Sequence, residues 1–73
     1  MDENELQDAL KTLLEEIAFM DEEDRENAGL GDDLADVTRV RTFDEEGVLT
    51  NNAGLTITTA DGSEFQLTIV RSR

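Results

Sequence analysis

Apolar residues recur at helical spacing in the first part of the chain. They occupy the i, i+3, i+4 and i+7 positions that place side chains on one face of an α-helix, namely Leu6, Leu10, Leu13, Leu14, Ile17 and Met20. Asp2 or Asn4 can cap the first turn, where acidic side chains also suit the positive end of the helix dipole. The pattern therefore predicts an amphipathic helix over residues 2–20, with the leucine face turned toward the core.

Phe19 projects away from this apolar stripe. One interpretation is that it packs in a two-layer core by contacting a later segment. The other is that it is an exposed aromatic side chain on which a partner docks. The sequence alone leaves both interpretations open.

The second half of the chain alternates β-branched or apolar residues with polar ones. Three segments show this alternation, at 37–43, 55–59 and 63–71, and such alternation is typical of strands. Asp61-Gly62 between the last two segments is a strong hairpin signal. Turns are expected at 44–47 and 51–54. The inner positions expected in the last two segments are Leu55, Ile57, Thr59, Phe65, Leu67 and Ile69, and the solvent-tolerant outer positions are Thr56, Thr58, Gln66 and Thr68.

In the first of these strands, strict alternation divides the side chains into two sets. One face is expected to carry Val37, Arg39, Arg41 and Phe43, and the other Thr38, Val40 and Thr42. Together these elements predict an α+β fold in a single small domain over residues 1–73. One long N-terminal amphipathic helix, plus a short second helix or turn, would pack on a three-stranded antiparallel β-meander within 37–71.

Charge is distributed unevenly along the chain. The 19 acidic and 6 basic side chains give a formal net charge of −13. Residues 1–36 hold 14 acids and two bases, a net −12, whereas residues 37–73 hold five acids and four arginines, a net −1. A general adaptation to high salt would coat the whole surface with acids, so the asymmetry favours a localised acidic surface.

The acids are densest in the segment 21–36. If residues 21–26 are helical, their five carboxylates are distributed along about 9 Å of helix axis, or about one per 1.8 Å. This is close to the spacing of charges along duplex DNA, which is about 1.7 Å. Such a surface could occupy the groove of a nucleic-acid-binding protein. The alternative is a solvated helix or loop face that binds no partner, which is the usual role of a run of charges. The candidate partner-binding residues are Asp21, Glu22, Glu23, Asp24, Glu26, Asp32, Asp33 and Asp36.

The residue types present argue against catalysis and against a metal or cofactor site. The chain has no His and no Cys, the side chains that most often serve as general base, thiolate nucleophile or transition-metal ligand. Neither acidic run matches the spacing of a calcium-binding loop. The strong negative charge also argues against direct binding to nucleic acid or to an anionic membrane.

In size, acidity and lack of catalytic groups, the chain resembles small phage-encoded inhibitors, including DNA mimics and some anti-CRISPR proteins. The resemblance is one of composition. It implies a non-catalytic interaction module that inhibits or regulates a basic, nucleic-acid-binding partner. The alternatives are a structural protein that acts through homo-oligomerisation, for which a homodimer is the simplest form, and a generic acidic domain of a salt-loving host. With no signal peptide and no long apolar run in sight, we expect a cytoplasmic protein.

Overall fold

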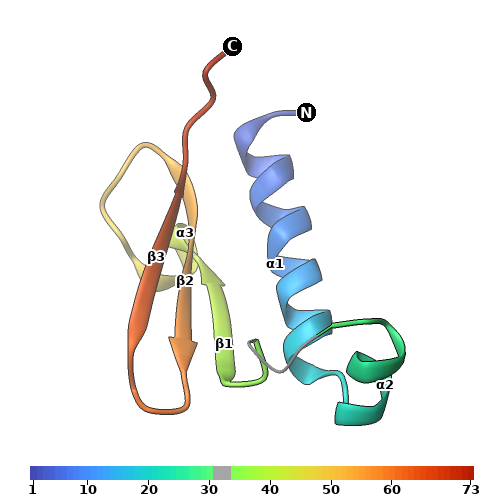
Figure 1. Cartoon of the computed structure of the whole chain (residues 1–73). Helices are drawn as coiled ribbons and strands as arrows, with labels where there is room; N and C mark the ends of the chain where they lie inside the picture. The colour runs from blue at the N-terminus through green and yellow to red at the C-terminus, as the bar shows by residue number, and fades with distance from the viewer. Residues whose placement is uncertain (31–33) are drawn as a thin grey trace.

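The computed structural model describes residues 1–30 and 34–73 of the chain (Figure 1). In chain order its elements are α1 (Glu3–Phe19), α2 (Glu22–Asn27), β1 (Val37–Thr42), α3 (Phe43–Glu46), β2 (Ala53–Thr59) and β3 (Glu64–Ile69). The strands pair antiparallel in the order β1-β2-β3, and α1 lies along one face of the sheet. The predicted α+β fold is confirmed. None of the helices within the described residues is long and apolar enough to span a membrane.

The first helix begins at a capping box. The Asp2 carboxylate accepts a hydrogen bond from the Glu5 backbone N–H at 2.8 Å, and the Glu5 carboxylate accepts one from the Asp2 N–H at 3.4 Å. The helix ends at Phe19, where Met20 takes an extended conformation. The helix expected over 2–20 is confirmed to within a residue at each end, and Asp2 is its cap.

α1 meets the sheet with a different face from the one expected. Its buried residues are Gln7 and Ala18, whereas Leu6 and Leu13 are 38% and 51% exposed. At 100° per residue, the direction of Gln7 and Ala18 lies about 90° from the centre of the leucine stripe. Within the stripe, Leu10 and Leu14 pack against the core, and both lie on the side nearer Gln7 and Ala18. The centre of the stripe therefore points parallel to the plane of the sheet and not into it.

A bulge in β1 changes which of its side chains point inward. The pairing with β2 shifts register between Val37 and Arg39, so that two residues of β1 stand against one of β2. Because a bulge breaks the two-residue repeat, Val37 and Val40 are both buried. The strict alternation expected over 37–43 is wrong for this reason.

The predicted turns at 44–47 and 51–54 are partly replaced by regular structure. Residues 43–46 form the helical turn α3, which Thr42 caps by accepting the Glu45 N–H and which ends at Gly47 with φ +72°. β2 already begins at Ala53, so that Gly54 lies within the strand. A Cβ atom at Gly54 would overlap the ring of Phe43 and the carbonyl oxygen of Leu67, so only glycine fits there.

Thr56 was expected at a solvent-tolerant outer position, and this is wrong. It is only 2% exposed. Thr56 lies in the central strand, and its partners across the sheet are Arg41 and Gln66. Directly paired residues share one face of a sheet, so Thr56 lies between two long side chains on that face.

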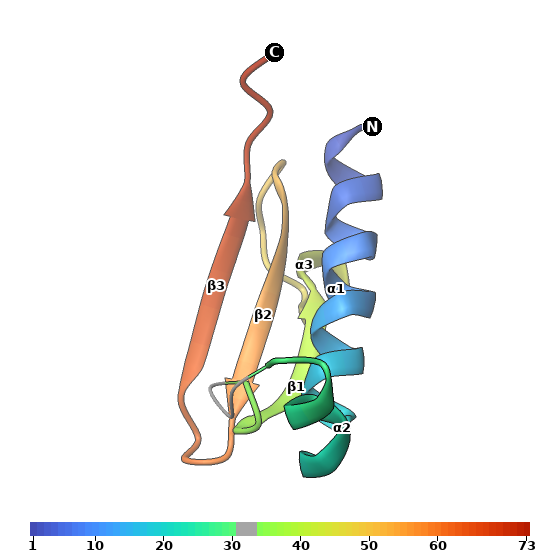
Figure 2. The ribbon, with the colours of Figure 1, turned by 45° about the vertical axis from the view of Figure 1, so that its right-hand side comes forward.

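The third strand is open on the face where burial was expected. α1 packs on β1 and β2, and Figure 2 shows β3 standing beyond them. Phe65 and Leu67 pair with Ile57 and Leu55, which places them on the α1 side of the sheet, yet they are 57% and 42% exposed. The inner face predicted for the last strand is therefore apolar but uncovered.

Candidate functional site

The acidic run beginning at Asp21 forms a short helix, one of the two structures that the sequence allowed. The Asp21 carboxylate caps α2 by accepting the backbone N–H of Asp24 at 2.8 Å. Acidic side chains fill the first turn, where the helix dipole favours negative charge. The chain leaves the helix at Gly29 with φ +76°, a conformation that glycine adopts without strain.

The carboxylates of this helix point outward and its single cation points inward. We call the five residues Asp21, Glu22, Glu23, Asp24 and Glu26 the acidic end, and all five are exposed. Arg25 is only 9% exposed, and its guanidinium donates a hydrogen bond to the backbone carbonyl of Met20, just beyond α1. A cation suits the C-terminal end of a helix. Arg25 thus ties α2 to α1 and leaves the outer surface of α2 to carboxylates.

The other predicted acids do not all belong to this surface. Asp32 and Asp33 lie outside the described residues. Asp36 is exposed but lines a shallow depression with Asp61 and Phe65, beside the β2–β3 turn. The structure therefore gathers five of the eight predicted residues at α2 and places Asp36 with the hairpin.

The Asp61 carboxylate accepts two hydrogen bonds within that turn. The Thr59 hydroxyl donates to it at 2.6 Å and the Ser63 backbone N–H donates at 2.9 Å. These hydrogen bonds, the Thr59 one first, lower the pKa of Asp61 to about 2. The sequence indicated only a turn at this position.

We expect this turn to weaken in acid. A lowered folded-state pKa gives stability that is present above the ordinary value of 3.8 and is lost as the pH falls toward about 2. Urea unfolding of the wild type and of Asp61→Asn should show the wild type more stable at about pH 5, with the difference vanishing near about pH 2. A difference that is the same at both pH values would contradict this role for Asp61.

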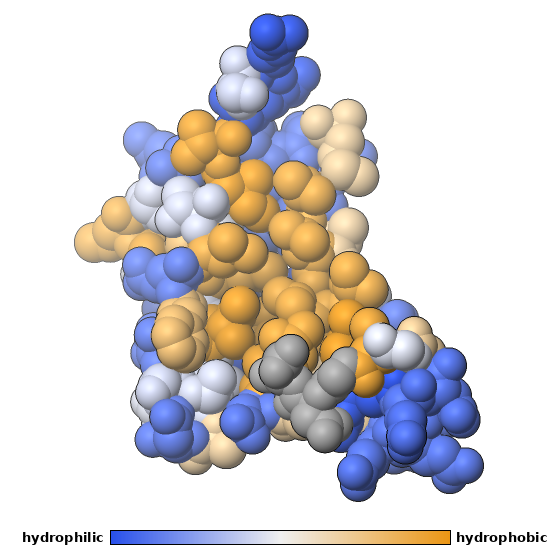
Figure 3. All heavy atoms as spheres, in the orientation of Figure 1, coloured by the Kyte–Doolittle hydropathy of each residue, from blue (hydrophilic) through white to orange (hydrophobic). Residues whose placement is uncertain are grey.

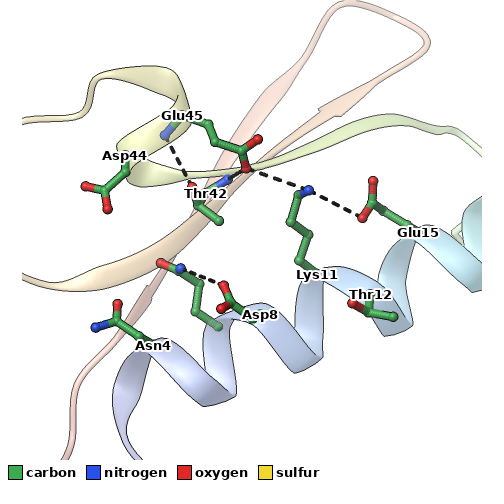
Figure 4. Close-up of a pocket in the computed structure, with 9 residues that line it drawn as sticks. Asn4, Asp8, Lys11, Thr12, Glu15, Thr42, Asp44 and Glu45 are labelled. Atoms are coloured by element: carbon green, nitrogen blue, oxygen red, sulfur yellow. Dashed lines mark hydrogen bonds and ion pairs between the residues drawn. The ribbon is translucent and has the colours of Figure 1, made fainter.

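A polar depression lies between α1 and α3 (Figure 4). Lys11 reaches across it, with its Nζ 3.5 Å from Glu15 and 3.7 Å from Glu45. The Thr42 backbone N–H, helped by the Thr42 hydroxyl and by Lys11, holds the pKa of Glu45 below its ordinary value. Because its lysine is enclosed between two carboxylates, this depression is best explained as an ion-pair network that joins α3 to α1.

The arginines of β1 have a similar structural role. Arg39 and Arg41 both lie 3.6 Å from one carboxylate oxygen of Glu46, at the end of α3.

Within the residues that the structure describes, no group of three acidic side chains is arranged to hold a metal ion. The exposed carboxylates of α2 therefore remain the main candidate surface.

Phe19 is 63% exposed and is not part of the buried core. The interpretation that it packs in a two-layer core is wrong, because most of the Phe19 side chain is exposed to solvent. Phe19 borders a depression together with Arg39 and Arg41. Its role as a docking aromatic stays a prediction.

The sequence pattern gave no hint of the role of Gln7. Its side chain is buried at 7% exposure, and its Oε1 accepts the backbone N–H of Gly54 at 2.9 Å, while its Nε2 donates to Asp8 at 3.2 Å. The one signal of its burial in the sequence is its position, because Gln7 lies seven residues before Leu14 and therefore on the same side of α1.

Comparison of the chain with models of known protein families, with curated protein sequences and with solved structures gives no match.

Proposed function

We propose that this chain is a non-catalytic protein–protein interaction module that binds a basic partner through its acidic end. The observation that supports the proposal is the division of charge on α2. Five carboxylates are exposed there, while Arg25 is buried and its guanidinium donates to the backbone carbonyl of Met20 at the end of α1. A cationic groove would therefore meet a surface on which five carboxylates are exposed.

The proposed partner is a nucleic-acid-binding protein, because its groove already accommodates closely spaced negative charge. The carboxylates would stand in for phosphates, as in DNA-mimicking inhibitors, and would draw the partner in by long-range attraction. Occupying the groove would block or regulate nucleic-acid binding. The chain's own net charge of −13 opposes direct contact with nucleic acid in the same complex.

The test is capture of proteins from a fraction that has been eluted from DNA-cellulose. The immobilised chain should retain a basic protein, and added duplex DNA should release it. A variant with Glu22→Gln, Glu23→Gln and Glu26→Gln should lose this capture, because three charges of the acidic end are removed. Asp21 is left intact in this variant, since its carboxylate caps α2.

The matched control removes the same charge from exposed positions elsewhere. Glu16→Gln, Asp44→Asn and Glu64→Gln lie on α1, α3 and β3 and are all exposed. This variant should capture the same protein with about the same yield as the wild type. If both triple variants behave alike, or if DNA does not compete, the acidic end is not the binding surface.

A further inference from the structure

An apolar surface extends over α1 and β3 and lies apart from the acidic end. Figure 3 shows apolar side chains gathered across the middle of the molecule, with the hydrophilic side chains of α2 at its lower right. We call this surface the apolar face and define it by the exposed or half-exposed residues Leu6, Leu13, Phe65, Leu67 and Ile69. It arises because the leucine stripe of α1 is turned sideways and β3 stands beyond α1.

The chain exposes more surface than a compact monomer of its size. Its accessible area is 5218 Å² for 8.1 kDa, against about 4,500 Å² expected from the scaling of area with mass. Its radius of gyration is 13.2 Å, against about 11 Å expected for a compact chain of this length. The excess area, about 700 Å², is close to the roughly 800 Å² that one partner contributes to a standard interface. The C-terminal residues 70–73 supply part of this excess, and the uncovered side of β3 supplies another part.

The apolar face carries the two halves of a complementary pair. Among the described residues, one half is the leucine stripe of α1, the centre of which does not pack on the sheet. The other half is β3, on which α1 of the same chain does not pack. A two-fold axis along the strand direction would place the stripe of each copy on β3 of the other. Both halves would then be covered by the same operation, as an isologous interface requires.

The charges at one end of the apolar face are compatible with a second copy. Leu6, at one end of the face, shares a small depression with the acids Asp2 and Glu3 and with Arg71, at the end of β3. In the two-fold arrangement, the start of α1 from one copy lies near the end of β3 from the other, so opposite charges meet. The acidic end stays outside the interface, which limits repulsion between two chains of this net charge.

From these observations we propose that the apolar face binds a second copy of this chain, forming a two-fold dimer in which α1 of each copy covers β3 of the other. The dimer would carry two acidic ends, both exposed, and could therefore engage two basic sites at once. The proposal does not depend on the identity of the basic partner.

The test is sedimentation equilibrium of the full chain over a range of concentrations. The wild type should have twice the 8.1 kDa mass of one chain. Leu13→Glu should reduce the mass to that of one chain, because it places a charge in the centre of the interface. The matched control is Leu49→Glu, which changes an equally apolar and fully exposed residue outside the face and should remain dimeric.

Several outcomes would overturn the dimer. These are a wild type that stays at 8.1 kDa at millimolar concentration, or a Leu49→Glu variant that dissociates as Leu13→Glu does. If Leu13→Glu does not fold, the wild type decides the matter through its melting temperature. A melting temperature that rises with protein concentration supports the dimer, because association is then linked to folding, and one that is independent of concentration contradicts it.

Discussion

Gly54→Ala is expected to remove a large part of the free energy of unfolding. The added methyl group would overlap the Phe43 ring and the Leu67 carbonyl oxygen, and the backbone of the central strand cannot move away without breaking its pairing on both sides. Overpacking of this kind costs about 1–3 kcal/mol, whereas a domain this small holds roughly 3–5 kcal/mol in total. Urea unfolding followed by circular dichroism at one fixed protein concentration measures the loss.

Thr58→Ala provides the control for this prediction. Thr58 lies on the same strand and, four residues from Gly54, on the same face, but it is only half-buried. Its replacement should cost at most about 1 kcal/mol, the span of strand preferences. If Gly54→Ala unfolds at the same urea concentration as the wild type, the close packing of Phe43 against β2 is wrong.

Gln7→Leu is expected to destabilise the fold by about 1–3 kcal/mol, the cost of leaving a buried polar group without a partner. The side chain is similar in size, but it has no oxygen to accept the backbone N–H of Gly54. The most specific readout is hydrogen exchange by NMR, in which the Gly54 amide should exchange faster in the variant than in the wild type.

Asp8→Ala separates this effect from the other contact of Gln7. It removes only the acceptor of the Gln7 Nε2 group and lies on the exposed side of α1. Gln7 and Asp8 line an open depression where water can replace the lost acceptor, so the effect should stay within about 0.5 kcal/mol, as is usual for surface substitutions. A Gly54 amide that exchanges equally slowly in Gln7→Leu would show that this hydrogen bond does not hold the strand to the helix.

The sequence predicted the elements better than their orientation. The helical spacing of apolar residues identified α1, because this spacing is a property of the local sequence and does not depend on tertiary contacts. It could not tell which part of the leucine stripe contacts the sheet, since that depends on Gln7 and Ala18 fitting against β1 and β2. The bulge in β1 and the packing of Phe43 against Gly54 were missed for the same reason, because both are set by tertiary contacts.

The sequence located the acidic run but left its structure open. It allowed a short helix or a turn, and in the structure Asp21 caps a helix there. The inward direction of Arg25 could not be read from the sequence, because it depends on where the end of α1 lies. Asp36 was grouped with α2 by proximity in the chain, whereas the fold places it beside the hairpin.

We propose that the exposed carboxylates on α2 bind a basic partner. The most direct measurement is the affinity of the chain for the captured protein, titrated from about 0.05 M to about 0.5 M NaCl, where screening of exposed charges strengthens markedly. We expect the dissociation constant of the wild type to rise steeply with salt. The variant with Glu22→Gln, Glu23→Gln and Glu26→Gln should bind weakly, and its dissociation constant should depend much less on salt. Equal affinity and equal salt dependence in the two proteins would contradict this proposal.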